Sequence, residues 1–348
     1  MRFFFTLILL LVAATLMAGC TTSDSEAAAW NDRGVALNEQ GKYNESLDAY
    51  NQALKLNPNN ASVWINKGDV LSDLKNFNES LMAYNQALNL NPDNASAWMD
   101  KGLVLFNLNN YNESLEAYNR ASIIDPENAR ALVDKGAVLS WQGKHNESLE
   151  AYNQALKYHP ENADAWGGKG WTLALLENYN ESIEAYTRSF ELAPNNSDRW
   201  DGMGYVFLKQ EKYDDALVAS NQALKINPND TYALNYKAYT LKKLGKYDDA
   251  LVVSDLALKI DPDFADAWAT KGSILNDQGK YSEAIAACDQ ALKIDPDNAN
   301  AWATKGSVLN NQGNYSDAIA ACDQALKIDP TNDDAKKERD IAQSKLKS

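Results

Sequence analysis

The chain has 348 residues, of which 45% are hydrophobic and 23% charged, so it is too apolar for a disordered polypeptide. Its formal net charge of −15 opposes the counterion release that drives nucleic-acid binding, and DNA and RNA are therefore poor candidate partners. The nine prolines, from Pro58 to Pro330, recur at a constant interval of 34 residues, which excludes the single core of an ordinary globular enzyme.

Residues 1–19 have the pattern of a secretory signal peptide. Arg2 precedes an almost wholly apolar stretch, residues 3–17, and the small pair Ala18-Gly19 stands directly before Cys20. Counted to Gly19, this stretch is about 17 residues long, which is also just long enough for an uncleaved membrane anchor. Either interpretation predicts that the rest of the chain lies outside the cytoplasmic membrane.

The four residues Met17-Ala18-Gly19-Cys20 resemble the lipobox of prokaryotic lipoproteins. The resemblance implies cleavage before Cys20, attachment of a lipid to its thiol, and an anchored position in a prokaryotic cell envelope. Residues 20–26 are polar and lack periodicity, and we interpret them as a tether between the anchor and the folded body.

Residues 27–332 divide into nine repeats of 34 residues. Positions 4, 8 and 11 of a repeat hold a large apolar residue, a small residue and a second large apolar residue, as in Trp30, Gly34 and Leu37. Their spacings of four and three predict a first helix over roughly the first fourteen positions. The repeats are residues 27–60, 61–94, 95–128, 129–162, 163–196, 197–230, 231–264, 265–298 and 299–332.

A second helix is expected in each repeat. Glycine is frequent at position 15, as at Gly41, where it favours a helix C-terminus. Position 18 is asparagine, aspartate or serine in every repeat, and we interpret it, for example Asn44, as the N-cap of the second helix. The proline at position 32, as at Pro58, predicts that this helix ends before it.

This pattern resembles the tetratricopeptide repeat family. The resemblance implies an all-α fold, a right-handed α-solenoid of nine helix-turn-helix repeats with a concave inner face. Residues 333–348 are interpreted as a capping helix that covers the last repeat. The first repeat carries the family pattern as Trp30, Gly34, Tyr43, Ser46, Tyr50, Ala53 and Pro58.

Some aromatic residues fall outside the packing positions of the repeat. In the family, positions 2, 5, 6, 9, 12 and 13 of the first helix line the concave groove, so the resemblance implies a ligand-binding strip there. The alternative is that the aromatic side chains at positions 9 and 12 are buried against the first helix of the adjacent repeat, and that the lysines simply lie on a solvated helix face. The predicted strip consists of Met99, Phe106, Trp141, Trp171, Tyr205, Tyr232, Tyr236 and Tyr239, accompanied by Lys209, Lys242 and Lys243.

Other polar motifs have simpler explanations. Asn-x-Ser/Thr sequons at the repeat junctions, with Asn60, Asn94, Asn195 and Asn229, are possible glycosylation sites in exposed turns. Cys288 and Cys322 occupy equivalent positions of neighbouring repeats, too far apart for a disulfide, and are predicted to be buried free thiols. The two histidines lack partners at ligand spacing, so neither a metal nor a cofactor is expected.

The sequence therefore predicts a non-catalytic scaffold that is anchored by lipid outside the cytoplasmic membrane and holds a peptide segment of another protein in its concave groove. The alternative is a structural cell-surface glycoprotein or spacer without a groove ligand. The carboxylate clamp known from the family uses a lysine at position 5 and an asparagine at position 9. In this chain no repeat has lysine at position 5 or asparagine at position 9. We therefore expect an apolar or aromatic contact surface.

Overall fold

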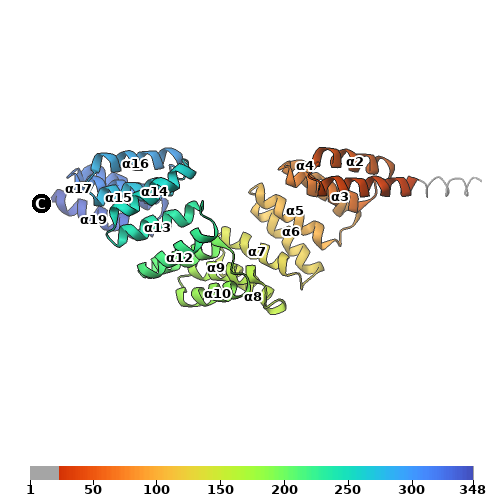
Figure 1. Ribbon diagram of the computed structural model, residues 1–348, viewed down its shortest axis with the longest axis horizontal. Coiled ribbons are helices and arrows are strands. Elements are labelled where there is room, and N and C mark those ends of the chain that lie inside the picture. Colours follow the sequence, from red (N-terminus) through yellow and green to blue (C-terminus); the bar gives the residue numbers. More distant parts are fainter. Residues whose placement is uncertain (1–22, 348) are drawn as a thin grey trace, which may run out of the picture. The chain divides into compact units, whose positions relative to one another are not determined.

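Every regular element over residues 23–347, which the computed structural model describes, is an α-helix, and the fold is an all-α helical repeat solenoid. Coiled ribbons make up the coloured part of the chain in Figure 1. The chain divides into two compact units, one ending at Thr172 and the other beginning at Leu173, within α9 (Ala163–Leu175). The first unit contains the helix over residues 23–39, then α2 (Tyr43–Leu56), α3 (Ala61–Asp73), α4 (Phe77–Leu90), α5 (Ala95–Asn107), α6 (Tyr111–Ile124), α7 (Ala129–Trp141) and α8 (His145–Tyr158). The second contains α10 (Tyr179–Leu192), α11 (Ser197–Lys209), α12 (Tyr213–Ile226), α13 (Thr231–Lys243), α14 (Tyr247–Ile260), α15 (Ala265–Asp277), α16 (Tyr281–Ile294), α17 (Ala299–Asn311), α18 (Tyr315–Ile328) and α19 (Asp333–Lys347).

The predicted tether is partly helical. Residues 23–26 are helical and continuous with the rest of the helix over residues 23–39, so the assignment of residues 20–26 to a tether is wrong for this part. Two polar contacts explain the difference, because Ser23 Oγ donates to the carbonyl of Leu56 (3.4 Å) and Asp24 Oδ1 accepts from Asn57 Nδ2 (3.2 Å). The signal segment and Cys20 lie outside the described residues. Between residues 23 and 347 no helix is sufficiently long and apolar to span a membrane.

The two helices of a repeat are joined by a turn at positions 15 and 16. Position 15 has a positive φ in all nine repeats, in glycine at five of them, such as Gly41 (71°), and in Lys75, Asn109, Glu177 and Glu211 at the others. The backbone amide of position 16 donates back to position 11, as from Lys42 to Leu37 (2.9 Å), which is the bonding expected of a left-handed helix C-terminus.

The N-cap predicted at position 18 is wrong. The second helix begins one residue earlier, at the aromatic position 17, as in Tyr43, and position 18 is already inside its first turn. No side-chain cap is present, because the tight turn makes position 16 the N-cap through its backbone alone, with Ser46 N donating to Lys42 O (3.0 Å). The true side-chain caps precede the first helices. Asparagine or aspartate at position 34 accepts from a backbone amide of the following turn, as Asn94 does from Ala97 (3.0 Å).

The core repeats with the sequence. In the first four repeats the buried serine at position 20 donates to the carbonyl of the glycine at position 8, as Ser80 does to Gly68 (2.8 Å). The tyrosine at position 24, such as Tyr84, packs its ring directly on the same glycine. The indole of the tryptophan at position 4, such as Trp64, donates to the carbonyl of the preceding proline (2.9 Å). Residues at positions 4, 8, 20 and 24 are therefore committed to packing.

The last helix, α19, packs against α17 and α18. Ala335 and Ala342 are fully buried against them, while most of its other side chains face solvent. The amide of Asn310 donates to both the carbonyl and the carboxylate of Glu338 (2.8 Å each). A polar outer side over a small apolar inner side suits a helix that ends a stack of repeats.

Candidate binding surface

Helix geometry places positions 2, 6, 9 and 13 of each first helix along one stripe, because they are separated by four, three and four residues. Within each unit the first helices of successive repeats touch: α3 meets α5 and α5 meets α7 in the first unit, while α11, α13, α15 and α17 follow one another in the second. These stripes therefore adjoin within a unit. We call the residues on them the first-helix surface.

In the first unit the aromatic part of this surface is centred on Trp141. The Trp141 side chain is 72% exposed, and its ring meets the edge of the half-buried Phe106, with ring centroids 6.4 Å apart. Phe106 also contacts Tyr111, at a position-17 packing site, with centroids 5.5 Å apart. Trp171 is 38% exposed. Trp141 is therefore supported on one side by an aromatic neighbour and open to solvent on the other.

Met99 does not belong to the predicted strip. Its side chain is only 6% exposed and packs in a core cluster with Leu115, Tyr118 and Ala131. The prediction was wrong because position 5 of a first helix faces the next repeat, here through Ala131 of α7. Met99 thus packs against the next repeat, whereas Trp141 contacts Phe106 of the preceding repeat and still remains largely exposed.

An acidic group that the sequence analysis missed lies on the same surface of the first unit. Asp69, Asp100 and Asp134 are half-buried on α3, α5 and α7, and Arg130 lies 4.0 Å from Asp100 Oδ1 and 3.7 Å from Asp134 Oδ2. The Tyr84 hydroxyl donates to Asp69 Oδ1 (2.6 Å).

Burial raises the pKa of all three carboxyl groups, and that of Asp100, beside Asp69, reaches about 6. Asp69 stands at position 9 of its repeat, and Asp100 and Asp134 at position 6, so the charges at these two positions predict the group from the sequence. The group offers three carboxylates against one guanidinium, which suits a cationic ligand.

In the second unit, tyrosines and lysines lie together on α11 and α13. Lys209 Nζ lies 5.5 Å from the centre of the Tyr205 ring, and Lys242 and Lys243 lie 5.7 and 5.2 Å from that of Tyr239. Cation–π contact thus gives these lysines a role beyond a simple solvated face. Lys242 also pairs with Asp277 (3.4 Å).

The remaining tyrosines of the strip differ in exposure. Tyr232 is 58% exposed and meets the edge of Phe264, with ring centroids 4.9 Å apart. Tyr236 is half-buried, and burial together with the nearby Asp201 carboxylate raises the pKa of its phenol. The structure thus brings Tyr205, Tyr236 and Tyr239 onto neighbouring helices of one unit, while Phe106 and Trp141 adjoin in the other.

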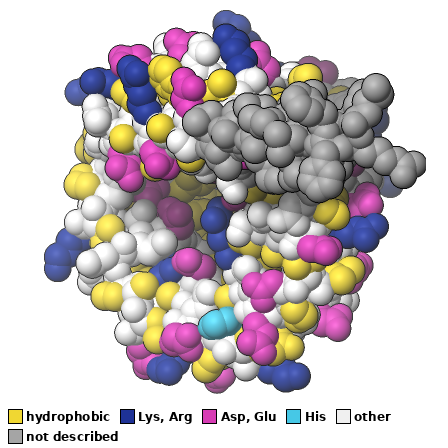
Figure 2. Space-filling model, turned by 90° about the vertical axis from the view of Figure 1, so that its right-hand side faces the viewer, with side chains coloured by type: hydrophobic (Ala, Val, Ile, Leu, Met, Phe, Trp, Pro, Cys, Tyr) yellow, Lys and Arg dark blue, Asp and Glu magenta, His cyan; other side chains and the backbone are white. Residues whose placement is uncertain are grey.

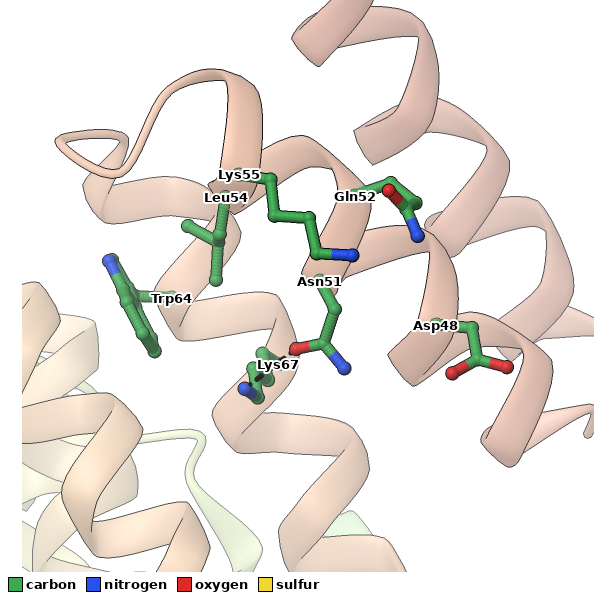
Figure 3. A pocket seen from close by; sticks show the side chains of 7 residues that line it. All are labelled: Asp48, Asn51, Gln52, Leu54, Lys55, Trp64 and Lys67. Carbon is green, nitrogen blue, oxygen red and sulfur yellow. Dashed lines mark hydrogen bonds between the residues drawn. The ribbon is translucent and has the colours of Figure 1, made fainter.

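Depressions elsewhere are features of the repeat. The larger, about 420 Å³, lies between α2 and α3 (Figure 3), where Lys67 Nζ donates to Asn51 Oδ1 (2.8 Å) and lies 5.2 Å from the centre of the Trp64 ring. A second, about 360 Å³, is lined by the equivalent pair Trp268 and Lys271. Because this tryptophan–cation pair recurs in six repeats, these depressions belong to the junctions between helices, and no predicted strip residue lines them.

The candidate glycosylation residues fall into two kinds. Asn195 and Asn229 are exposed, whereas Asn60 and Asn94 are half-buried and use their side-chain oxygens as N-caps of α3 and α5. The cysteine prediction is confirmed: Cys288 and Cys322 are free and fully buried. Burial raises the pKa of these thiols to about 12 and about 11, so they are poor nucleophiles in the folded protein.

On the face drawn in Figure 2, charged side chains are dispersed. Figure 2 shows acidic side chains scattered over the face that it presents, with lysines and arginines between them. Among residues 23–347, only Asp198, Asp201 and Asp230 form a group of three acidic, histidine or cysteine side chains close enough to hold one metal ion.

Comparisons with known proteins agree on the repeat. Family models described as tetratricopeptide repeat match residues 27–60, 65–129, 133–197, 207–274 and 275–338, which together make up most of the chain. No curated protein matches this chain.

Several solved structures have a similar fold. A tetratricopeptide repeat protein from Parabacteroides merdae is 17% identical over 72% of this chain and 98% of its own, with a TM-score of 0.60. A chain of the APC/C hetero-tetramer Cut9–Hcn1 is 19% identical over 85% of this chain and 58% of its own (TM-score 0.62). PilF of Pseudomonas aeruginosa is 17% identical over 62% of this chain and 99% of its own (TM-score 0.54). At these identities the similarities establish the fold alone.

Proposed function

This chain belongs to the tetratricopeptide repeat family, and from that premise we propose that it is a non-catalytic scaffold whose first-helix surface binds a segment of another protein. The fold is one that supports protein–protein interaction, and proteins built from it are generally not enzymes. The observation that carries the proposal is the exposure of Trp141, 72%, at a position where the repeat does not need an aromatic side chain. Large exposed aromatic residues with a supporting neighbour are typical of binding surfaces.

The chemistry of the first unit favours a segment that is both basic and apolar. Asp69, Asp100 and Asp134 would pair with lysine or arginine side chains, and removal of water on binding would strengthen these pairs. Asp134 and Trp141 lie seven residues apart on α7, which places them on one stripe about 10 Å apart. A basic residue and an apolar residue of one extended segment can span that distance.

We further propose that the protein acts outside the cytoplasmic membrane of a prokaryote, held there by a lipid on Cys20 or by an uncleaved signal. The support is the sequence alone, namely the apolar stretch over residues 3–17 and the Met-Ala-Gly-Cys motif. Metabolic labelling with a fatty acid tests the lipid, because label should enter the wild-type protein and be absent from Cys20→Ala. Label retained by that variant contradicts lipidation at this thiol.

Peptide selection tests the binding function. A random peptide library is selected on the chain from residue 20 onward, and the enriched peptides are titrated by fluorescence anisotropy. We expect basic residues together with an aromatic or aliphatic residue, and a dissociation constant that rises tenfold or more in Trp141→Ala, equivalent to about 1.4 kcal/mol.

Ile123→Ala is the matched control, because Ile123 is also 72% exposed but lies on the second helix α6. Equal affinity of wild type and Trp141→Ala, with unchanged circular dichroism, would refute this use of the surface. A Trp171→Ala variant, tested in the same way, shows whether the second extra tryptophan contributes.

A structural spacer is the second candidate function. Its support is the exposure of Asn195 and Asn229, which lie in the turns before α11 and α13 and could carry glycan without disturbing a cap. Intact-mass measurement on protein from its native cells separates the two functions. Glycan at these asparagines, together with a failed peptide selection, would favour the spacer.

A further inference from the structure

Three carboxyl groups of the second unit converge where two first helices begin. Asp198 and Asp201 lie in the first two turns of α11, and Asp230 is the residue that directly precedes α13. One carboxylate oxygen from each residue lies within 4.8 Å of those of the other two. Residues distant in the chain are thus brought to a single point at the edge of the first-helix surface.

Two of the three carboxyl groups are buried, and one oxygen of Asp201 has no hydrogen-bond partner. Asp201 is 9% exposed and Asp230 8% exposed, while Asp198 faces solvent. The Oδ1 atom of Asp201 is buried without a hydrogen-bond donor. A buried acceptor without a partner is costly, and a buried charge without a counter-charge is more so.

The surroundings of Asp201 do not supply that counter-charge. Besides burial, the groups that act on it are the carboxylate of Asp230, which also hydrogen-bonds to it, and the carboxylate of Asp198, so its charged neighbours are negative like itself. In the other repeats position 5 holds uncharged residues, either apolar and buried, as Met99, Ala269 and Ala303, or half-buried, as the asparagines Asn31 and Asn235. An acidic residue is therefore out of place here unless something positive binds it.

Capping does not explain the acidity of Asp230. Its Oδ1 accepts from the amide of Ala233 (3.2 Å), but asparagine performs the same task before α5 and α17, at Asn94 and Asn298. Repeat six alone combines aspartate at positions 2, 5 and 34. The extra negative charge thus gathers at one place without a role in the repeat itself.

We propose that Asp198, Asp201 and Asp230 form a Ca²⁺ site that joins the start of α11 to the start of α13. Calcium takes six to eight oxygen ligands at about 2.3–2.6 Å, so two oxygens on one ion lie at most about 5 Å apart, which agrees with the spacing of these three. Exposure of Asp198 leaves room for water to complete the shell. The ion supplies the positive charge that the buried carboxylates lack, and it fixes two helices that carry Tyr205 and Tyr236.

Calcium titration of the chain from residue 20 onward tests this site. Isothermal titration at pH 8 should give one site with a dissociation constant on the order of 10⁻⁴ M. Mg²⁺ should bind at least tenfold more weakly, because its shorter bonds, about 2.0–2.1 Å, demand a tighter octahedron. Absence of saturable binding below about 10 mM Ca²⁺ would overturn the proposal and would mean that the carboxyl groups share a proton instead. Equal affinity for Mg²⁺ would overturn it as well.

Two variants locate the ion. Asp230→Asn keeps the helix cap and Asp201→Asn keeps the side-chain shape, and each should weaken Ca²⁺ binding at least tenfold. Asp215→Asn, which makes the same charge change at an exposed site on α12, should leave the affinity unchanged. Unchanged affinity in Asp230→Asn, with the helical circular dichroism of wild type, contradicts the site even if Asp201→Asn fails to fold.

Discussion

The glycine at position 8 allows a sharp test of how the repeats pack, because two repeats make opposite predictions for the same substitution. A Cβ atom added at Gly68 would lie 2.7 Å from Tyr84 Cε1 and 3.0 Å from two other ring atoms. A Cβ atom added at Gly204 would have no neighbour closer than Ala219 Cβ, at 3.6 Å, which is ordinary contact. Repeat seven already carries Ala238 at this position, fully buried.

The magnitudes follow from two opposing effects. Alanine is favoured over glycine inside a helix by about 1 kcal/mol, and both variants gain this. At Gly68 the gain is outweighed, because the Tyr84 ring is 2% exposed and its hydroxyl is bound to Asp69, so the ring cannot move aside freely. Overpacking of this kind costs roughly 1–3 kcal/mol. We expect Gly68→Ala to lower the free energy of unfolding by up to about 2 kcal/mol and Gly204→Ala to raise it by about 0.5–1 kcal/mol.

Urea unfolding followed by circular dichroism measures the total effect, and hydrogen exchange of peptides from α3 and α4 or from α11 and α12 locates it, since a repeat array need not unfold in one step. The conflict at Gly68 should disappear in a Tyr84→Ser background, because repeat six combines its glycine with Ser220. Stabilisation by Gly68→Ala in the wild-type background, or destabilisation by Gly204→Ala, would refute the packing argument.

Three further predictions follow from single groups. Glu211 has a φ of 57°, so Glu211→Gly should raise the free energy of unfolding by up to about 1 kcal/mol in urea titrations, whereas Gly245→Ala, at 74°, should lower it; the same sign in both would contradict the turn analysis. Burial and the Asp69 charge raise the pKa of Asp100 to about 6, so above about pH 4 the folded protein keeps a proton that the unfolded chain has released. The free energy of unfolding should therefore fall by at most about 3 kcal/mol as the pH rises from 4 to 6, and Asp100→Asn should flatten this slope. In a Cys20→Ala background, Ellman's reagent at pH 8 should find no reactive thiol in the folded protein and two after denaturation, while rapid native reaction would contradict the burial of Cys288 and Cys322.

The repeat was predictable because its signals are short-range and copied nine times. The apolar spacing of the first helix, the turn at position 15 and the proline at position 32 each report a local backbone preference. The cap at position 18 was misassigned for a related reason: Asn44 is a good capping residue by type, but the turn before it already satisfies the helix start through Lys42. The type of a residue does not show whether that residue or its neighbour becomes the N-cap, because the conformation of the preceding turn decides this.

The candidate surface was less predictable, because it depends on what each first helix meets in the next repeat. Met99 and Asp201 share position 5, and both are buried. Met99 packs among apolar side chains, whereas one carboxylate oxygen of Asp201 has no hydrogen-bond partner. Trp141, at position 13, lies at the end of its helix and remains exposed beside Phe106. The acidic group of the first unit went unnoticed because its members come from three repeats, and that of the second because Asp230, the last residue of repeat six, is brought to Asp198 and Asp201 only where α13 begins beside α11.

Some positions of the repeat support packing and others lie on the surface, which explains how one fold can present different side chains along its length. The second helix and positions 4 and 8 of the first support the stack, and their residues are constrained because a side chain such as Tyr84 or Cys288 must fit against the glycine at position 8. Positions 2, 6, 9 and 13 bear little of that constraint. They include carboxylates on α5 and α7, whereas on α11 and α13 they include tyrosines and lysines, with Asp198 at the start of α11. A partner that binds along these helices would therefore meet acidic contacts in one unit and cation–π pairs in the other. The two units can then be inactivated separately, by Asp134→Asn in the first and by Tyr239→Ala in the second, without loss of the helices that display them.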